Sequence, residues 1–124
     1  MKAYASWIII IVLVLLAIAG MVWYAAQPGQ YDEFASCIKE SGTKFFGAFW
    51  CPHCQEQKAL FGKSASKLPY VECSNPDGQS QTQVCKDNKI ESYPTWVWKD
   101  GTRKTGTIAL SDLSTFTGCP LIKK

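Results

Sequence analysis

The sequence predicts an α/β domain whose mixed four-stranded sheet is flanked by helices, preceded by one N-terminal transmembrane helix. Two observations predict this class. An uncharged apolar stretch occupies Trp7 to Ala26, and the remaining chain alternates between segments with helical spacing and short segments typical of strands. Strands that are separated by helices pair in parallel, whereas a tight turn makes the last two strands antiparallel, so we expect a mixed sheet.

The stretch from Trp7 to Ala26 has the length of a membrane span. About 20 apolar residues at about 1.5 Å each match the roughly 30 Å hydrocarbon core of a bilayer. Trp23 and Tyr24 lie near its end, as Trp7 does at its start, where aromatic rings prefer the membrane interface. A cleavable signal peptide is the alternative, with Ala17-Ile18-Ala19 as its cleavage site. The apolar run continues past this site, which favours an anchor.

The chain divides into an anchor or signal peptide at 1–26, a linker at 27–30 and a domain at 31–124. The linker is polar and should free the domain from the span. Lys2 precedes the span whereas Asp32 and Glu33 follow it, which favours a cytoplasmic N-terminus. We therefore expect a single-pass protein of the cell membrane whose domain is extracytoplasmic, in the periplasm, in a lumen or outside the cell.

Helical spacing and a short aromatic run predict the first two elements of the domain. Residues 31–41 have apolar side chains three and four positions apart, and Gly42 then ends the helix. The residues of its inner face are Tyr31, Phe34 and Ile38. The run at 43–50 is apolar and aromatic and too short for a helix of the usual length, so it predicts a buried central strand.

A longer helix, a second strand and a short helix follow. Residues 53–68 predict a helix with one buried face, which Gly62 weakens and Pro69 ends. The residues of this face are Cys54, Leu60, Phe61, Ala65 and Leu68. Residues 70–73 alternate in the way of a strand, and after a turn 81–88 predict a short polar helix.

A hairpin and a helix should complete the domain. Residues 95–98 and 103–108 predict two strands, which a turn containing Asp100-Gly101 joins. Ser111 is suited to cap the start of a last helix, and Gly118 to end it. The apolar side chains expected to face inward from this helix are Leu113 and Phe116.

The segment Trp50-Cys51-Pro52-His53-Cys54 stands where the buried strand should end and a helix begin, and a Cys-x-x-Cys pair there is suited to disulfide exchange. Cys51 should remain open to solvent and attack, and Cys54 should resolve. The helix N-terminus stabilises a thiolate at Cys51, and Pro52 fits the first helical position. His53 can be cationic beside Cys51, which favours the reduced form and makes the disulfide a better oxidant.

A Cys-x-x-Cys pair also occurs in zinc sites and in structural disulfides. Zinc needs four ligands, usually from a second such pair or from paired histidines. The only histidine is His53, and the other four cysteines are scattered singly, so no metal site is expected. An inert bridge between Cys51 and Cys54 is the remaining alternative to redox chemistry.

Six cysteines after the apolar stretch indicate an oxidising compartment, because so many are unusual in a reducing cytosol. Their count is even, so complete pairing is possible. Besides the motif pair we favour Cys73 with Cys85, on either side of a turn-rich loop, and Cys37 with Cys119, from the first and last helices. A bridge across the shorter loop would stabilise the domain by about 3 kcal/mol. Buried free thiols are the alternative.

The net charge of +3 is modest and forms no long run. A nucleic-acid-binding role would require a basic stripe or interleaved aromatic residues on a known module, and the sequence contains neither. We therefore expect no nucleic-acid partner.

Three features together resemble the thioredoxin superfamily: the segment Phe49 to Cys54 at a strand-to-helix junction, Tyr93-Pro94-Thr95 about 40 residues later, and a Lys-Asp-Gly hairpin. The resemblance covers residues 31–119. It implies that Pro94 is preceded by a cis peptide bond and faces the catalytic disulfide. It also implies that Tyr93, Pro94 and Thr95 contact the substrate.

The segments at 47–55, 70–73 and 92–96 are similar to the thioredoxin-like domain fused to bacterial and plant homologues of vitamin K epoxide reductase. That resemblance implies a protein dithiol oxidase whose electrons pass to a quinone in a membrane part. This chain has one span and not a multi-helix bundle. It should therefore hold no cofactor of its own and use a vitamin K epoxide reductase-like membrane oxidase as a separate partner.

The buried aspartate of cytosolic thioredoxins falls here at Phe45, so proton transfer to Cys54 needs water or another acid. Glu72 is a candidate, with a solvated carboxylate at the strand end as the alternative. The sequence thus predicts a membrane-anchored enzyme that oxidises the thiols of substrate proteins through Cys51 and Cys54. Two alternatives are an anchored reductase fed with electrons through the membrane, as in cytochrome maturation, and a binding module with an inert bridge, for which burial of both sulfurs would be the sign.

Overall fold

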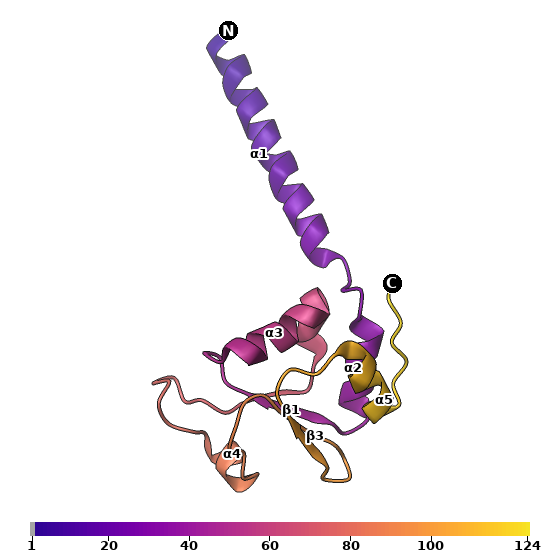
Figure 1. The fold of residues 1–124 in the computed structure, drawn as a ribbon. Helices are drawn as coiled ribbons and strands as arrows, with labels where there is room; N and C mark the ends of the chain where they lie inside the picture. The colour runs from indigo at the N-terminus through magenta and orange to yellow at the C-terminus, as the bar shows by residue number, and fades with distance from the viewer. Residues whose placement is uncertain (1) are drawn as a thin grey trace.

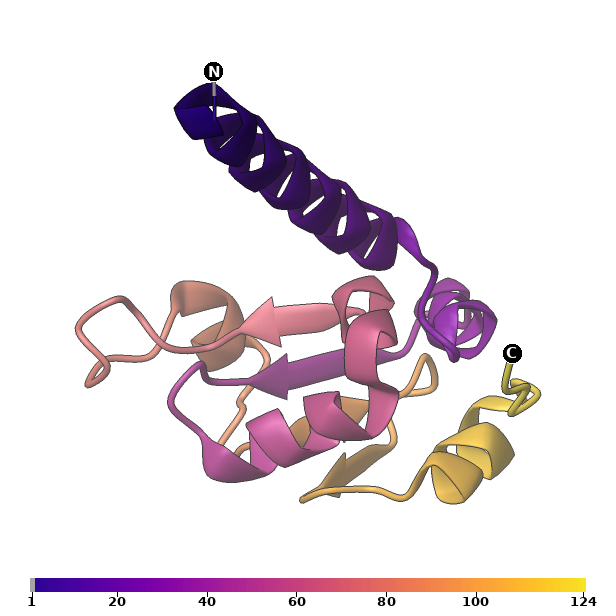
Figure 2. The same cartoon turned by 90° about the horizontal axis from the view of Figure 1, so that it is seen from above.

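The computed structural model describes residues 2–124 as a long N-terminal helix followed by a small α/β domain (Figures 1 and 2). Its elements in chain order are α1 (Lys2–Ala26), α2 (Asp32–Glu40), β1 (Lys44–Gly47), α3 (Pro52–Phe61), the 3₁₀ helix η1 (Gly62–Lys67), β2 (Tyr70–Glu72), α4 (Gln83–Asp87), β3 (Thr95–Val97), β4 (Arg103–Thr105) and α5 (Leu110–Thr117). The predicted class, a mixed four-stranded sheet flanked by helices, is confirmed.

The sheet has the strand order β2-β1-β3-β4. β1 pairs with β2 in parallel, and both β1 with β3 and β3 with β4 are antiparallel. The expectation that strands separated by helices pair in parallel is therefore wrong for β3. Thr95 opens β3 opposite Phe46, near the end of β1 at which β2 also stops. Because the chain between β2 and β3 does not return along the sheet, β3 must run in the opposite direction.

β1 is buried on both faces, which separates the core into two clusters. Alternation along the strand sends Phe45 and Phe46 to opposite sides of the sheet. Phe45 stacks on Trp96 at 4.5 Å between ring centroids and joins the larger cluster with side chains of α2, α3 and α5. Phe46 packs in the smaller cluster with Cys73, Cys85 and Ile90.

α3 is shorter than the helix expected over 53–68. It ends at Phe61, because Gly62 adopts a φ of +55°, and a 3₁₀ turn completes the segment. The buried residues of α3 are Cys54, Gln57 and Phe61, whose spacing of three and four follows one helical face. Leu60 lies beside that face and is exposed, which corrects its predicted burial.

The last helix also differs from its prediction. The N-cap of α5 is Ala109, two residues before the predicted Ser111, so the helix begins at Leu110; Gly118 ends it with a φ of +71°. Leu113 is fully buried as expected. Phe116 is 48% exposed and packs edge-on against the half-buried Trp98, so it lies at the rim of the core and not inside it.

α1 is the one helix in the described part of the chain that is long and apolar enough to cross a membrane. Its residues 4–26 have a mean hydropathy of 2.9 and none of the span is buried against the domain. A signal sequence would share these properties. The described side chains begin at Tyr4, so Lys2, which the predicted orientation uses, lies outside them.

The linker after α1 is packed and does not leave the domain free. Gly29 is buried, and a Cβ there would lie 2.3 Å from the Oγ of Ser64 in η1. The Tyr31 backbone N–H donates to the same hydroxyl at 2.9 Å. Lys63 hydrogen-bonds to the Tyr24 carbonyl, and its ammonium lies 3.8 Å from the centroid of the Tyr24 ring. These contacts hold the end of α1 against η1, contrary to the expectation.

Candidate active site

The two motif cysteines lie at the N-terminus of α3. Cys51 is the N-cap, with an extended backbone, and Pro52 occupies the first turn. The Cys54 backbone N–H donates to Cys51 Sγ at 3.2 Å, so the first turn of the helix directs a hydrogen-bond donor at this sulfur. Such a contact stabilises a thiolate more than a thiol.

Both motif cysteines are free thiols and both are buried. Cys51 is 4% exposed and Cys54 is 1% exposed. The expectation that Cys51 remains open to solvent is therefore wrong. Cys51 belongs to the larger core cluster, against which Tyr93 packs, and the adjacent Trp50 ring meets the Tyr93 ring edge-on at 5.9 Å.

Burial controls the acidity of Cys54. Desolvation, with a contribution from its hydrogen bond to Cys51, raises the pKa of the Cys54 thiol to about 12. A backbone hydrogen bond at Ala48 and the charge of Lys58 act in the opposite direction. At neutral pH Cys54 is therefore protonated and needs assistance to become a thiolate.

The Tyr93–Pro94 peptide bond is cis. Pro94 is fully buried, and the Thr95 side chain is also buried, with its hydroxyl donating to the Ser92 carbonyl at 2.7 Å. Tyr93 is half-buried, and its hydroxyl accepts a hydrogen bond from Gln81 at 2.7 Å. The structure therefore brings Tyr93 to the motif through Trp50, while the Thr95 side chain faces inward.

Trp50 and His53 present their side chains at the surface. Trp50 is half exposed, and its indole N–H donates to the Ser74 hydroxyl at 2.9 Å. His53 Nδ1 lies 3.0 Å from a carboxylate oxygen of Glu56 and its side chain is 67% exposed. The partner that the structure gives to His53 is thus a carboxylate one turn along α3.

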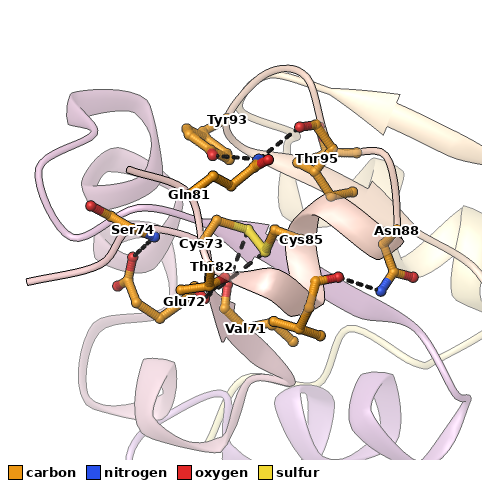
Figure 3. Close-up of a disulfide and its surroundings, with 12 residues drawn as sticks. Val71, Glu72, Cys73, Ser74, Gln81, Thr82, Cys85, Asn88, Tyr93 and Thr95 are labelled. Atoms are coloured by element: carbon orange, nitrogen blue, oxygen red, sulfur yellow. Dashed lines mark hydrogen bonds between the residues drawn. A yellow bond between two sulfur atoms is a disulfide. The ribbon is translucent and has the colours of Figure 1, made fainter. Parts of the chain in front are cut away.

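The loop between β2 and α4 lies beside the motif, and Figure 3 shows the disulfide and the polar contacts at its base. A disulfide joins Cys73 to Cys85 across its base, and Cys37 is likewise bonded to Cys119 on the far side of the domain. Gln81 donates from the loop to the Tyr93 hydroxyl, as Figure 3 shows. A Cβ on Gly78 would contact both Phe49 and Trp50, so the loop reaches the aromatic residues beside the motif.

Glu72 accepts hydrogen bonds from Tyr70 and from the backbone just before the motif. The Tyr70 hydroxyl donates to Glu72 Oε2 at 2.8 Å, and burial, with the neighbouring carboxylate, raises the pKa of Tyr70. Glu72 Oε1 accepts from the backbone N–H groups of Phe49 at 3.2 Å and Ser74 at 2.9 Å. Glu72 therefore contacts Tyr70, and Tyr70 in turn interacts electrostatically with Cys54.

No cluster of three or more histidine, cysteine, aspartate or glutamate side chains that could hold a metal ion occurs among residues 2–124, apart from side chains left undescribed at the N-terminus. The site as described consists of thiols, aromatic rings and backbone donors. Its chemistry is that of sulfur exchange.

A thioredoxin family model matches residues 27–116 of this chain. The chain belongs to the thioredoxin family. Its thioredoxin domain is similar to thiol-disulfide oxidoreductase LTO1 of Arabidopsis thaliana, with 44% identity over 92 residues, which cover 70% of this chain and 24% of that protein. It is also similar to a thioredoxin domain-containing protein 5 homolog of Drosophila melanogaster, with 33% identity over 100 residues, 68% of this chain and 23% of that protein. The chain thus spans about a quarter of the length of these relatives.

Sequence reasoning missed Gln57, which fixes α3 in this thioredoxin domain. Its amide is buried and makes hydrogen bonds to both the N–H and the carbonyl of Ile108, at 2.7 Å and 3.0 Å. Its Oε1 also accepts from the Trp96 indole N–H at 3.3 Å. The available signal was its position three residues after Cys54, on the same helical face.

Two further residues beside Cys54 were missed. Gly47 ends β1, and a Cβ there would lie 2.9 Å from both Cys54 Sγ and Tyr70 Cε2. Lys58 lies four residues after Cys54, and its ammonium is 3.5 Å from the centroid of the Tyr70 ring. Only the helical spacing of Lys58 could be read from the sequence, because the approach of β2 depends on the sheet.

Proposed function

We propose that this chain is a membrane-anchored, extracytoplasmic thiol–disulfide oxidoreductase that oxidises protein dithiols with its Cys51–Cys54 disulfide. The observation that carries the proposal is the position of Cys51, which caps α3 and accepts the Cys54 N–H inside a thioredoxin-family domain. The relative named a thiol-disulfide oxidoreductase supports the same chemistry. Because an N–H donor stabilises a thiolate, it favours the reduced pair and makes the disulfide an oxidant.

The reaction exchanges sulfur bonds in two steps. A substrate thiolate attacks Cys51 Sγ, the Cys51–Cys54 bond breaks, and Cys54 leaves as a thiolate while a mixed disulfide forms. A second substrate thiolate then attacks the substrate sulfur of that bond, and Cys51 leaves as a thiolate. Two electrons pass from the substrate dithiol to the cysteine pair, the substrate thiols having lost their two protons to water and the two cysteine thiolates taking two protons from water.

Residues around the motif would guide the substrate. We propose that a substrate segment lies along Tyr93, Pro94 and Thr95, with contact to Thr95 made by its backbone because its side chain is buried. Phe49 and Trp50, each about half exposed, would provide apolar contact beside it. Since Cys51 is 4% exposed, side chains around it would have to move before a substrate thiolate reaches it.

A separate protein would reoxidise the cysteine pair. We propose a quinone-linked membrane oxidase of the vitamin K epoxide reductase type, because the one candidate span among the described residues would hold the domain beside a membrane partner. A shared membrane raises the effective concentration of the two partners for each other. The packed linker supports a restricted set of domain orientations at the membrane surface.

The burial of both motif cysteines favours one competing function, a binding module with an inert bridge. The redox state of the pair in the native membrane separates the two functions.

The test is to trap thiols in native membranes with a mass-shifting alkylating agent and to score Cys51 and Cys54. A double variant, Cys51→Ala with Cys54→Ala, supplies the control for the other four cysteines. We expect a mainly oxidised pair that becomes reduced when the quinone-linked oxidase is removed. A mainly reduced pair in the presence of that oxidase would indicate a reductase, and a pair that never changes its state would indicate the inert module.

A further inference from the structure

We propose that Lys58 supplies the positive charge that stabilises the Cys54 thiolate during disulfide exchange, and that the Tyr70 ring holds this charge in position. The inference goes beyond the proposed oxidase function, because the Cys54 thiolate forms whichever way the electrons flow. It concerns only the exchange chemistry of the cysteine pair.

Cys54 requires such a charge because it reacts in an apolar setting. Cys54 is 1% exposed and belongs to an apolar cluster that includes Phe45. A thiolate there loses its hydration and gains little from apolar neighbours. A nearby cation lowers the free energy of the thiolate relative to the thiol.

The absence of a side chain at Gly47 lets Cys54 approach Tyr70. A Cβ at this position would lie 2.9 Å from both Cys54 Sγ and Tyr70 Cε2, so sulfur and ring occupy the two sides of one small space. Only a residue without a Cβ leaves this approach open. The Tyr70 ring is therefore a direct neighbour of the resolving sulfur.

Lys58 reaches the same ring from the helix that carries the sulfur. It is four residues after Cys54, one turn along the same side of α3, and it is half-buried. Its Nζ lies 3.5 Å from the Tyr70 centroid, a distance at which an ammonium is attracted to the aromatic face. The ring thus holds the ammonium on the side of α3 that carries Cys54.

Tyr70 is itself fixed by a carboxylate. Its hydroxyl donates to Glu72, and two backbone N–H groups hold the other Glu72 oxygen. The groups whose charge acts on Cys54 are Lys58 on α3 and the Cys51 sulfur, and Cys54 in turn acts on Tyr70 of β2. Lys58 is the cation among these groups, and its effect lowers the pKa of Cys54 against the effect of burial.

The step assisted by Lys58 can be written for both directions. When a substrate thiolate attacks Cys51, the electron pair of the broken Cys51–Cys54 bond passes to Cys54 Sγ, and the resulting thiolate later takes a proton from water. In reverse, the Cys54 thiol loses its proton to water, and its thiolate attacks Cys51 Sγ and expels the substrate sulfur. Lys58 remains an ammonium throughout.

The reverse step can be measured alone with the full chain in detergent. The reagent is the aromatic disulfide made of two thionitrobenzoate groups. Cys51 of the reduced protein attacks it, which forms a mixed disulfide and releases one coloured thiolate. Cys54 then attacks the mixed disulfide and releases a second coloured thiolate. The rate of this second phase does not depend on reagent concentration. Below the pKa of Cys54 it is proportional to the thiolate fraction, so it reports the effect of Lys58 on that thiolate.

We expect Lys58→Gln to slow the second phase about tenfold at neutral pH and to move its pH profile about one unit upward, since one pKa unit changes the thiolate fraction tenfold. Lys58→Arg should keep most of the rate. Lys63→Gln is the matched control, because Lys63 makes the same ammonium–ring contact with Tyr24 far from the motif. An unchanged profile in folded Lys58→Gln, or an equal shift in Lys63→Gln, would overturn the proposal.

Two variants of Tyr70 provide an independent test should Lys58→Gln not fold. Tyr70→Phe keeps the ring that holds the ammonium and loses the hydroxyl, so the pH profile should move little. Tyr70→Leu removes the ring and should move the profile upward in the same direction as Lys58→Gln. Equal profiles for these two variants would show that the ring does not position the charge.

Discussion

Gly47 has no side chain, and this absence allows Cys54 and Tyr70 to approach each other closely. The position has no room for a Cβ, and its two nearest neighbours are the resolving sulfur and the ring that contacts Lys58. A side chain at this residue would therefore affect both the packing of the domain and the position of the reactive Cys54 sulfur. A side chain there would have to displace either the sulfur or the ring.

We predict that Gly47→Ala destabilises the domain by about 1–3 kcal/mol, because the added methyl group overpacks a filled site. The exchange rate of the cysteine pair should fall with it. Urea unfolding followed by tryptophan fluorescence measures the change. Gly20→Ala is the control, since a Cβ there meets nothing within 4 Å. Equal unfolding midpoints for wild type and Gly47→Ala would contradict this packing.

The raised pKa of Cys54 predicts an alkaline loss of stability in the reduced protein. The folded thiol has a pKa of about 12, above its unfolded value of 9.0, so the folded state retains its proton where the unfolded state has lost it. The contribution of the Cys54 thiol to the free energy of unfolding is then fully present below pH 9. Above pH 9 it falls, by up to about 1.4 kcal/mol per pH unit. Urea unfolding from pH 8 to pH 10 measures the slope.

Cys54→Ala is the control for this pH dependence, because it removes the thiol and keeps the fold around it. The slope near pH 9 should disappear in this variant. A weaker fall above pH 10 should remain, since the pKa of Tyr70 is also raised. A Cys54→Ala protein with the wild-type slope near pH 9 would show that another group titrates there.

Among the elements, helix α3 has a defined cap at each end and one buried side chain in its middle that bonds it to the rest of the domain. Cys51 caps its start, Gly62 ends it, and Gln57 ties it to the segment after β4. The sequence predicted the start, because Pro52 suits the first helical position, and the hairpin, because Asp-Gly is a turn signal. It could not predict the direction of β3, since periodicity reports which side chains are buried and not how strands are ordered.

We predict that Gln57→Leu destabilises the domain by about 2–4 kcal/mol, because it leaves the Trp96 indole N–H and the Ile108 backbone groups buried without partners. Thermal unfolding in detergent measures the effect. Gln83→Ala is the matched control, since the exposed Gln83 amide bonds only to Asp87 at the surface of α4. A loss below about 0.5 kcal/mol in Gln57→Leu would contradict the role of this contact.

For the whole molecule, the main finding is that the apolar helix and the thioredoxin domain meet at a packed joint. Gly29 lies against Ser64, and Lys63 contacts Tyr24 at the end of α1. The sequence Gln27-Pro28-Gly29-Gln30 gave no indication of this, because its composition is that of a flexible linker and the contact depends on η1, far along the chain. These contacts thus restrict the position of the apolar helix relative to the domain.

We predict that Gly29→Val opens this joint, because its side chain would overlap Ser64. The hydrogen bond from the Tyr31 N–H to the Ser64 hydroxyl should break, and hydrogen exchange at 27–31 should accelerate by about tenfold or more. Gly20→Val serves as the control, with no neighbour within 4 Å. Unchanged exchange in Gly29→Val would mean that the joint is not packed as described.

The central claim is that Cys51 exchanges disulfides with substrate proteins and that Cys54 resolves the mixed disulfide. The most direct measurement is the capture of mixed disulfides by the full chain in native membranes, compared between Cys54→Ala and Cys51→Ala on non-reducing gels. Cys54→Ala should accumulate high-mass adducts that disappear on reduction, and Cys51→Ala should accumulate few. A Cys54→Ala protein that forms no adducts, or adducts that are equally abundant in both variants, would contradict the claim.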